Sequence, residues 1–230
     1  MENFDYIRRN FSALNEEIVN LSNRLGINAP TLVSVTKSGS DEELLALAAS
    51  GALDIGENRP GELKRRYEVL RALGFSPRMH EIGTLQRNKI KLIADVAYMI
   101  HSVDSLHLAR DINRHAEARG RIIPVLIEVN SAREAQKSGV MPEDAERLLT
   151  ELLELKNISV EGLMTMGPVT DSAEEIRPYF RETKRLFDRL GERYGFGPSP
   201  TLSMGMSDSW QVAVEEGSTL IRVGRSLFVK

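Results

Sequence analysis

The chain has 230 residues, of which 41% are hydrophobic and 27% charged, and its formal net charge at pH 7 is −3. This length and composition predict one large folded core, and the mixed charge argues against the basic footprint that nucleic acid or a membrane surface requires. The chain contains no cysteine, which excludes disulfides and thiolate chemistry.

Neither a membrane span nor a targeting segment is apparent. No apolar stretch approaches the roughly 18 residues of a membrane-spanning helix, and the first residues, Met1–Asp5, lack the regions of a signal peptide. We therefore expect a soluble, cytoplasmic protein. The histidines have no metal-ligand spacing, so we expect no metal.

A long amphipathic helix is the first predicted element. Apolar residues recur in steps of three and four over residues 3–25, and Gly26 ends the pattern. Residues 31–36 then predict a strand, and a capping box at Ser40–Glu43 begins a helix over residues 41–50. These residues form the first βα unit.

The βα unit recurs along the rest of the chain. Further strands are predicted at 53–55, 79–82, 96–100, 122–129, 160–164, 201–204 and 218–223. Further helices are predicted at 60–73, 86–94, 104–119, 142–155, 172–194 and 208–216. Pro178 is expected in or before the first turn of its helix.

Eight strands alternating with helices predict an α/β fold, a single (β/α)8 TIM-barrel domain over residues 1–230. An open doubly wound sheet fits less well, because the first turn, Lys37–Ser40, lacks the glycine pattern of a dinucleotide-binding loop. The chain stops at Lys230, before an eighth outer helix. We therefore expect the extra amino-terminal helix to cover the flank of the last strand.

Lys37 stands at the carboxyl end of the first predicted strand, the end where βα barrels keep their chemistry. Groups in the barrel mouth would desolvate the amine and favour its neutral form, which forms Schiff bases with carbonyl compounds. The alternative is a lysine whose stem packs and whose charged head reaches solvent. Taken alone, Lys37 fits the alternative better.

Glycine-bearing turns follow the last two predicted strands, at Ser203–Ser207 and Arg222–Ser226. Backbone N–H groups in such turns bind phosphate, and the Ser207 hydroxyl would add a directed donor. Ser207 and Asp208 also fit a plain helix cap. Because TIM barrels often bind phosphate beside these strands, the two turns together predict a phosphate site facing Lys37.

Arg222 lies in the apolar run of the last predicted strand, where an unpaired guanidinium is costly. A buried salt bridge is the ordinary explanation. The alternative is contact with a cofactor ring nitrogen. Because arginine keeps its proton, it would leave a pyridine nitrogen unprotonated and weaken the ring as an electron sink. Such a site favours holding a cofactor over carbanion chemistry.

Other residues near the predicted strand ends complete the candidate set. Asn58 and His80 fit hydrogen bonding or packing beside a cofactor ring, and fit turn or helix-cap roles almost as well. Met204 and Met206 flank Gly205 and indicate an adaptable apolar wall.

Short segments from the first predicted strand to the last carry a family resemblance. They are Val33–Lys37, Asp54–Asn58, His80–Lys89, Ile100–Asp104, Lys137–Gly139, Gly162–Met164, Leu202–Asp208 and Ile221–Gly224. Together they resemble the pyridoxal phosphate homeostasis protein family, whose fold is similar to the barrel domain of alanine racemase, the fold-type III arrangement for pyridoxal phosphate.

The resemblance implies that Lys37 holds pyridoxal 5′-phosphate (PLP) as a Schiff base and that Arg222 faces the pyridine nitrogen. It implies that Ser207, Gly224 and Arg225 bind the phosphate. It also implies a ring pocket lined by Asn58, His80, Met204 and Met206.

The chain departs from the family pattern in three places. Arg59 and Met79 stand where the family more often has aromatic residues, and Arg225 stands where it has a small hydroxyl residue. At Arg225 the backbone N–H remains as a phosphate donor, and the charge would add an ion pair.

The expected function is a non-catalytic protein that holds PLP, buffers its reactive aldehyde and passes it to PLP-dependent apoenzymes, as a monomer. The alternative is an amino-acid racemase. Its relatives take a second acid or base from an additional carboxyl-terminal domain, before which this chain ends, so a dimer partner or an inward-facing Tyr98 would have to supply that group. A third hypothesis is an aldolase that uses Lys37 as a nucleophile on a phosphorylated sugar.

Overall fold

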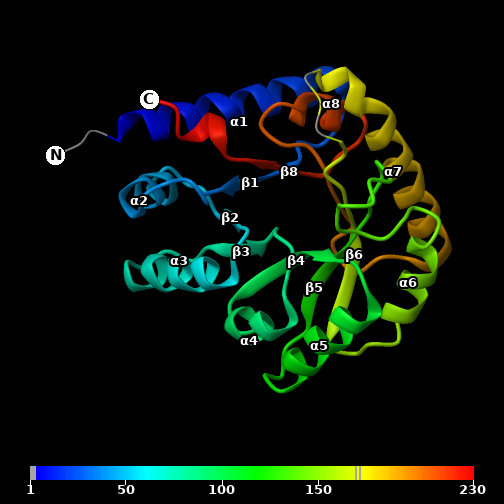
Figure 1. The fold of residues 1–230 in the computed structure, drawn as a ribbon. Coiled ribbons are helices and arrows are strands. Elements are labelled where there is room, and N and C mark those ends of the chain that lie inside the picture. Colours follow the sequence, from blue (N-terminus) through cyan, green and yellow to red (C-terminus); the bar gives the residue numbers. More distant parts are fainter. Residues whose placement is uncertain (1–3, 169, 171) are drawn as a thin grey trace.

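The computed structural model describes residues 4–168, 170 and 172–230, and its eight parallel strands close into a barrel in chain order (Figure 1). The strands are β1 (Thr31–Val35), β2 (Asp54–Glu57), β3 (Arg78–Glu81), β4 (Ala97–Val103), β5 (Ile123–Glu128), β6 (Ile158–Met164), β7 (Thr201–Ser203) and β8 (Leu220–Val223). The predicted TIM-barrel fold is confirmed.

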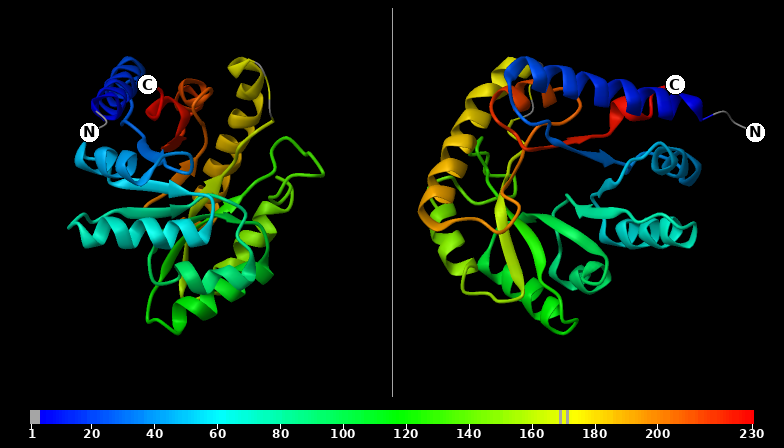
Figure 2. Two further views of the ribbon diagram at one scale, coloured as in Figure 1. Left: turned by 60° about the vertical axis from the view of Figure 1, so that its left-hand side comes forward. Right: turned by 180° about the vertical axis from the view of Figure 1, so that it is seen from behind.

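Helices surround the barrel and connect its strands (Figure 2). They are α1 (Asp5–Leu25), α2 (Asp41–Ala49), α3 (Pro60–Ala72), α4 (Ile90–Ile93), α5 (Leu106–Glu117), α6 (Ala145–Leu152), α7 (Ala173–Tyr194) and α8 (Trp210–Glu215), with short 3-10 helices η1 (Arg87–Lys89) and η2 (Arg225–Leu227). In the part of the chain that the structure describes, no helix is long and apolar enough to span a bilayer.

The hydrophobic core has two parts. The larger part lies between strands and helices and includes residues such as Ile55 and Phe180, which are fully buried. A smaller cluster of Met99, Leu126 and Met164 comes from three adjacent strands. Polar groups of the strands that are buried beside these residues need hydrogen-bond partners.

Helix α1 takes the place of an eighth outer helix. It ends at Gly26, whose φ of 66° is in the left-handed region that glycine adopts at low cost. It packs against α2, α8 and η2, and the Asn10 amide donates to the carbonyl oxygens of Leu227 at 3.3 Å and Val229 at 2.8 Å. The expected cover for the flank of the last strand is therefore present, because α1 contacts α8 and η2, the elements before and after β8 (Figure 2).

The placement expected for Pro178 is wrong. Helix α7 begins at Ala173, so Pro178 lies in its second turn. Proline has no N–H to donate to the carbonyl of Glu174. Both residues are exposed, so water can satisfy that carbonyl, while buried Ile176 and Phe180 hold the helix on either side.

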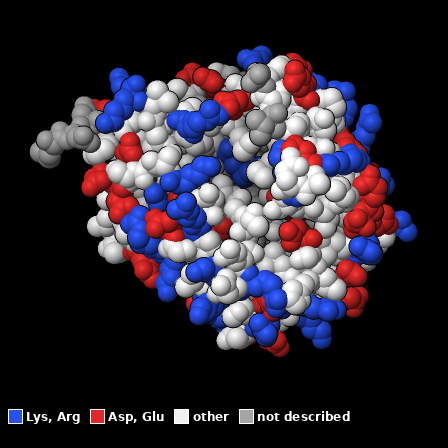
Figure 3. All heavy atoms as spheres, viewed as in Figure 1, with Lys and Arg blue, Asp and Glu red and all other residues white. Residues whose placement is uncertain are grey.

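Ion pairs balance the surface charge locally. Arg177 on α7 pairs with Glu174, Glu215 and Glu216, and Arg133 pairs with Glu182. Basic and acidic side chains are accordingly interspersed over the face shown in Figure 3, which carries no large field of one sign.

Candidate functional site

Lys37 and the last glycine turn lie at the same edge of the barrel mouth. Strands β1 and β8 are hydrogen-bonded neighbours, with Ser34 in register with Val223. Lys37 follows β1 in an exposed turn, and Gly224 follows β8. A Cβ on Gly224 would lie 2.9 Å from the carbonyl oxygen of Val35, so only glycine lets the two turns approach this closely.

The two predicted phosphate turns contact each other. The backbone N–H of Gly224 donates to the Ser207 hydroxyl at 3.3 Å, and the N–H of Arg222 donates to the carbonyl of Gly205 at 3.0 Å. Gly205 has a φ of +94°, and a Cβ there would lie 2.5 Å from the Cβ of Ala213. The alternative interpretation of Ser207 and Asp208 as helix caps is wrong, because α8 begins only after Ser209.

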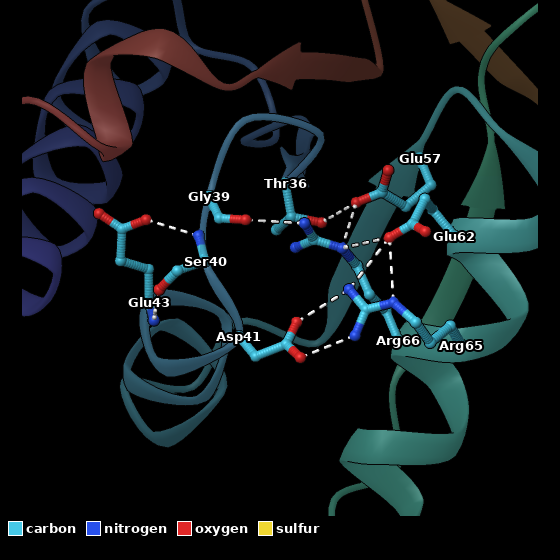
Figure 4. Close-up of polar contacts among 9 residues, drawn as sticks. All are labelled: Thr36, Gly39, Ser40, Asp41, Glu43, Glu57, Glu62, Arg65 and Arg66. Carbon is cyan, nitrogen blue, oxygen red and sulfur yellow. Dashed lines mark hydrogen bonds and ion pairs between the residues drawn. The ribbon is translucent and has the colours of Figure 1, made fainter.

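The turn that carries Lys37 is supported from behind by a buried ion pair (Figure 4). Arg66 Nε lies 3.1 Å from Glu57 Oε1, and the two side chains are 5% and 1% exposed. Arg66 also donates to the carbonyl of Gly39 at 2.8 Å, and Thr36 donates to Glu57 at 2.5 Å. Burial raises the pKa of Glu57, although the Thr36 hydroxyl and the Arg66 charge oppose that rise.

A second set of contacts fixes the other end of the same turn. The predicted capping box is confirmed: the N–H of Glu43 donates to the Ser40 hydroxyl at 3.2 Å, and the N–H of Ser40 donates to the Glu43 carboxylate at 2.7 Å. Arg65 on α3 donates two hydrogen bonds, of 2.7 and 2.9 Å, to the Asp41 carboxylate. The backbone from Thr36 to Asp41 is therefore held on both sides (Figure 4). Lys37 belongs to this segment, and it is exposed rather than enclosed as expected.

Arg222 is buried inside the barrel mouth, where its described hydrogen-bond partners are a hydroxyl and a carbonyl group. It is 4% exposed, and its guanidinium donates to the Ser203 hydroxyl at 2.5 Å and to the carbonyl of Thr165 at 3.1 Å. Burial lowers the pKa of Arg222 to about 10, with the charge of Glu128 acting in the opposite direction. The alternative of a buried salt bridge is wrong, because no described carboxylate forms an ion pair with Arg222.

The other predicted residues divide between rim and interior. Asn58 and Arg225 are exposed, and Met206 is 41% exposed. Met204 is fully buried in the larger core cluster, and His80 is 1% exposed, with both ring nitrogens hydrogen-bonded. The structure thus brings Ser207 and Gly224 into contact, places the Lys37 turn at the neighbouring strand end, and buries Met204 and His80.

Tyr98, the proton donor considered for a racemase, is in the wrong place for that role. It is the second residue of β4, so it lies near the amino-terminal end of the strand, opposite the mouth. Its ring packs beside Arg78 and His80, and the residue is 39% exposed. The racemase hypothesis therefore loses its intramolecular second acid.

Several buried polar residues near the mouth escaped sequence reasoning. Ser203 and His101 contact each other inside the barrel. The signal that could have indicated them is a hydroxyl and an imidazole within strands that are otherwise apolar. Glu81 and Glu128 end β3 and β5. Burial raises the pKa of Glu81 to about 8 and that of Glu128 to about 7, with Glu57 and Asp104 respectively adding to the effect.

The chain is similar to proteins of one family over nearly its whole length. The family model of the alanine racemase N-terminal domain matches residues 10–230. A pyridoxal phosphate homeostasis protein of Aquifex aeolicus is 40% identical over 203 residues, which cover 88% of each chain. PipY of Synechococcus elongatus, solved with PLP bound, is 29% identical with a TM-score of 0.85, covering 97% of this chain and 100% of PipY.

More distant structures share the fold alone. Alanine racemase of Clostridium difficile is 19% identical, with a TM-score of 0.76 over 98% of this chain and 60% of the racemase chain. The chain belongs to the pyridoxal phosphate homeostasis protein family, whose barrel is that of the alanine racemase N-terminal domain.

Proposed function

We propose that this protein binds PLP at the barrel mouth as a Schiff base on Lys37 and serves intracellular PLP homeostasis without a reaction of its own. The observation that carries the proposal is the close approach of Gly224 to Val35, two residues before Lys37, at the edge where β1 meets β8. An amine and a phosphate cradle at one edge suit a phosphorylated aldehyde. Relatives that carry this function in their name support it.

The residues at the mouth fit the parts of the cofactor. The Ser207 hydroxyl and the backbone N–H groups of Gly224 and Arg225 would hold the phosphate, since the Gly224 cradle has no room for a Cβ. Arg222 retains N–H donors that no described residue accepts, and these would face the pyridine nitrogen. Asn58 and Met206 would border the ring from the rim, with His80 and Met204 behind it. When bound, PLP supplies an electrophilic aldehyde to the Lys37 amine.

The charge of Arg222 favours storage of the cofactor over catalysis. A guanidinium beside the pyridine nitrogen cannot readily give that nitrogen a proton, so the ring is a weak electron sink. The exposed rim would let PLP leave toward PLP-dependent apoenzymes. We expect the protein to act in the cytoplasm. We also expect a monomer, because the apolar face of α1 is used in packing against its own barrel.

Absorption spectroscopy tests the proposal. The purified protein should take up PLP with a visible band that borohydride abolishes, and Lys37→Ala should lose that band with an unchanged far-ultraviolet circular dichroism spectrum. Lys91→Ala, which removes an exposed lysine of α4, is the matched control and should retain the band. A reducible adduct in Lys37→Ala equal to that of the control would refute the assignment, and inversion of alanine by the loaded protein would refute the absence of catalysis.

A further inference from the structure

A continuous series of hydrogen bonds crosses the inside of the barrel. Arg222 on β8 donates to the Ser203 hydroxyl at 2.5 Å, and Ser203 Oγ lies 3.0 Å from His101 Nδ1. His101 Nε2 lies 2.9 Å from His80 Nδ1, and His80 Nε2 lies 2.9 Å from Asp54 Oδ1. Because β4 and β7 are not neighbours in the barrel, the contact between His101 and Ser203 must pass through its interior.

Both ends of the series have a fixed hydrogen-bonding role. A guanidinium can only donate, so the Ser203 oxygen accepts from Arg222 and its own proton is free to go to His101 Nδ1. An ionised carboxylate can only accept, so His80 Nε2 carries a proton toward Asp54. A neutral His80 then accepts at Nδ1, which requires a proton on His101 Nε2. The assignments made from the two ends agree at every link.

We propose that Ser203, His101, His80 and Asp54 form a one-way hydrogen-bond chain that positions the Arg222 guanidinium in the site. All hydrogen bonds in the chain point from Arg222 toward Asp54, and both imidazoles are neutral with the proton on Nε2. The effect of the positioned Arg222 on a cofactor ring rests on the proposed function. The assignment of protons within the hydrogen-bond chain is independent of that function.

The opposite arrangement leaves polar groups unsatisfied. If His80 were charged, His101 would have to accept from it and donate to Ser203, and the Ser203 proton would then have no acceptor among the described residues. Burial also lowers the pKa of both His80 and His101, because the charged imidazolium is poorly solvated there. The charged groups nearest to the series are Arg222 and Glu128 at one end and Asp54 with Arg78 at the other.

The series also shows how a buried cation can be held without an ion pair. Asp54 is clamped by Arg78 at the far end of β2 and β3, so the acceptor end of the chain is fixed. Ser203 and the carbonyl of Thr165 hold the two terminal nitrogens of Arg222. The guanidinium therefore keeps one orientation, with its other N–H groups free for a ligand.

Nitrogen-15 NMR of the histidine side chains tests the proton assignment on the protein without PLP. The signals of His80 and His101 are identified by their loss in His80→Gln and His101→Gln. Each ring should show the nitrogen-15 shifts of a neutral imidazole with its proton on Nε2, and these shifts should not change between pH 6 and pH 8. A proton on Nδ1 of either neutral ring, or an imidazolium at pH 7, would overturn the proposed direction of the hydrogen bonds. This result does not depend on cofactor binding, so it is independent of the proposed function.

A second measurement tests the positioning of Arg222 in the PLP-loaded protein. Ser203→Ala removes the acceptor of Arg222 and should keep the borohydride-reducible adduct on Lys37. Its visible band should change with pH between 6 and 8, because a loosened guanidinium lets the pyridine nitrogen take a proton. Ser22→Ala, which removes a buried hydroxyl of α1 that donates to the carbonyl of Ile18, is the matched control and should have the pH-invariant band of the unsubstituted protein. Identical pH profiles for the two variants overturn the positioning role, whereas absence of the adduct from the unsubstituted protein overturns the proposed function instead.

Discussion

The rim of the barrel mouth and the polar residues behind it are built in opposite ways. The rim side chains Lys37, Asn58, Met206 and Arg225 are exposed. The buried polar layer consists of Glu57, Arg66, His101, Ser203 and Arg222, and each of its members is hydrogen-bonded or ion-paired to another strand, helix or turn.

This difference shows which contacts keep the site in a fixed geometry. Groups that must meet a ligand are left accessible, while their backbone and their neighbours are fixed by contacts that a ligand never touches. Apart from Arg222, which is also proposed to contact the ligand, residues of the buried polar layer should therefore reduce stability when substituted, and substitutions at the rim should reduce binding.

The largest stability effect is expected at Glu57. Glu57→Gln removes the nearer counter-charge of the buried Arg66 guanidinium and leaves only Glu62 Oε2, 4.0 Å from its Nε, among the described carboxylates, and we expect the free energy of unfolding to fall by about 3 kcal/mol. Urea unfolding at pH 7 measures it. The control is Glu182→Gln on α7, whose half-exposed carboxylate pairs with Arg133 and should matter by less than about 1 kcal/mol. Equal losses in the two variants would remove the distinction between rim and buried layer.

Glu81 should make stability depend on pH. Its pKa is about 8 in the folded protein and 4.5 ordinarily. The folded state therefore holds a proton that the unfolded state releases, and stability falls as pH rises from about 5 to 8. Glu81→Gln should remove this loss, gaining about 2 kcal/mol on the unsubstituted protein between about pH 6.5 and pH 8.5 in urea titrations. Parallel pH profiles for the two proteins would show that Glu81 is not protonated in the fold.

A substitution at Gly224 tests whether the backbone of this turn binds the phosphate of PLP. A Cβ at this position would meet the carbonyl oxygen of Val35 at 2.9 Å, so Gly224→Ala should push the turn away from β1. We expect at least about a tenfold loss of PLP affinity by equilibrium dialysis, or about 1.4 kcal/mol. Gly61→Ala on α3, where a Cβ meets nothing within 4 Å, is the matched control. Unchanged affinity in Gly224→Ala would separate the turn from the phosphate.

Arg225 should have the smallest effect. Its exposed side chain pairs with Asp208, which is equally exposed. We expect Arg225→Ala to weaken PLP binding by no more than about threefold, and less at high salt, because exposed charges are screened. A large loss that persists at high salt would mean that the Arg225 side chain, rather than its N–H, is the phosphate ligand.

The fold was predictable because its signals are local. Hydrophobic period, the capping box at Ser40 and Gly26 each act within a few residues, and all of them appear as expected. Arg222 was recognisable as an unusual residue, but its partners were not. Ser203 lies 19 positions away from Arg222, and His101 lies 102 positions away from Ser203. Only the closure of the barrel brings them together, and no spacing in the sequence records that contact. The exposure of Lys37 was missed for a similar reason, since it depends on how eight loops are arranged around the mouth.

Peptide mapping after borohydride reduction identifies the lysine that carries the cofactor. The protein is saturated with PLP, reduced, digested and analysed by mass spectrometry. We expect one phosphopyridoxyl group, carried by the peptide that contains Lys37. A modification spread over surface lysines, or located on another single lysine, would contradict it.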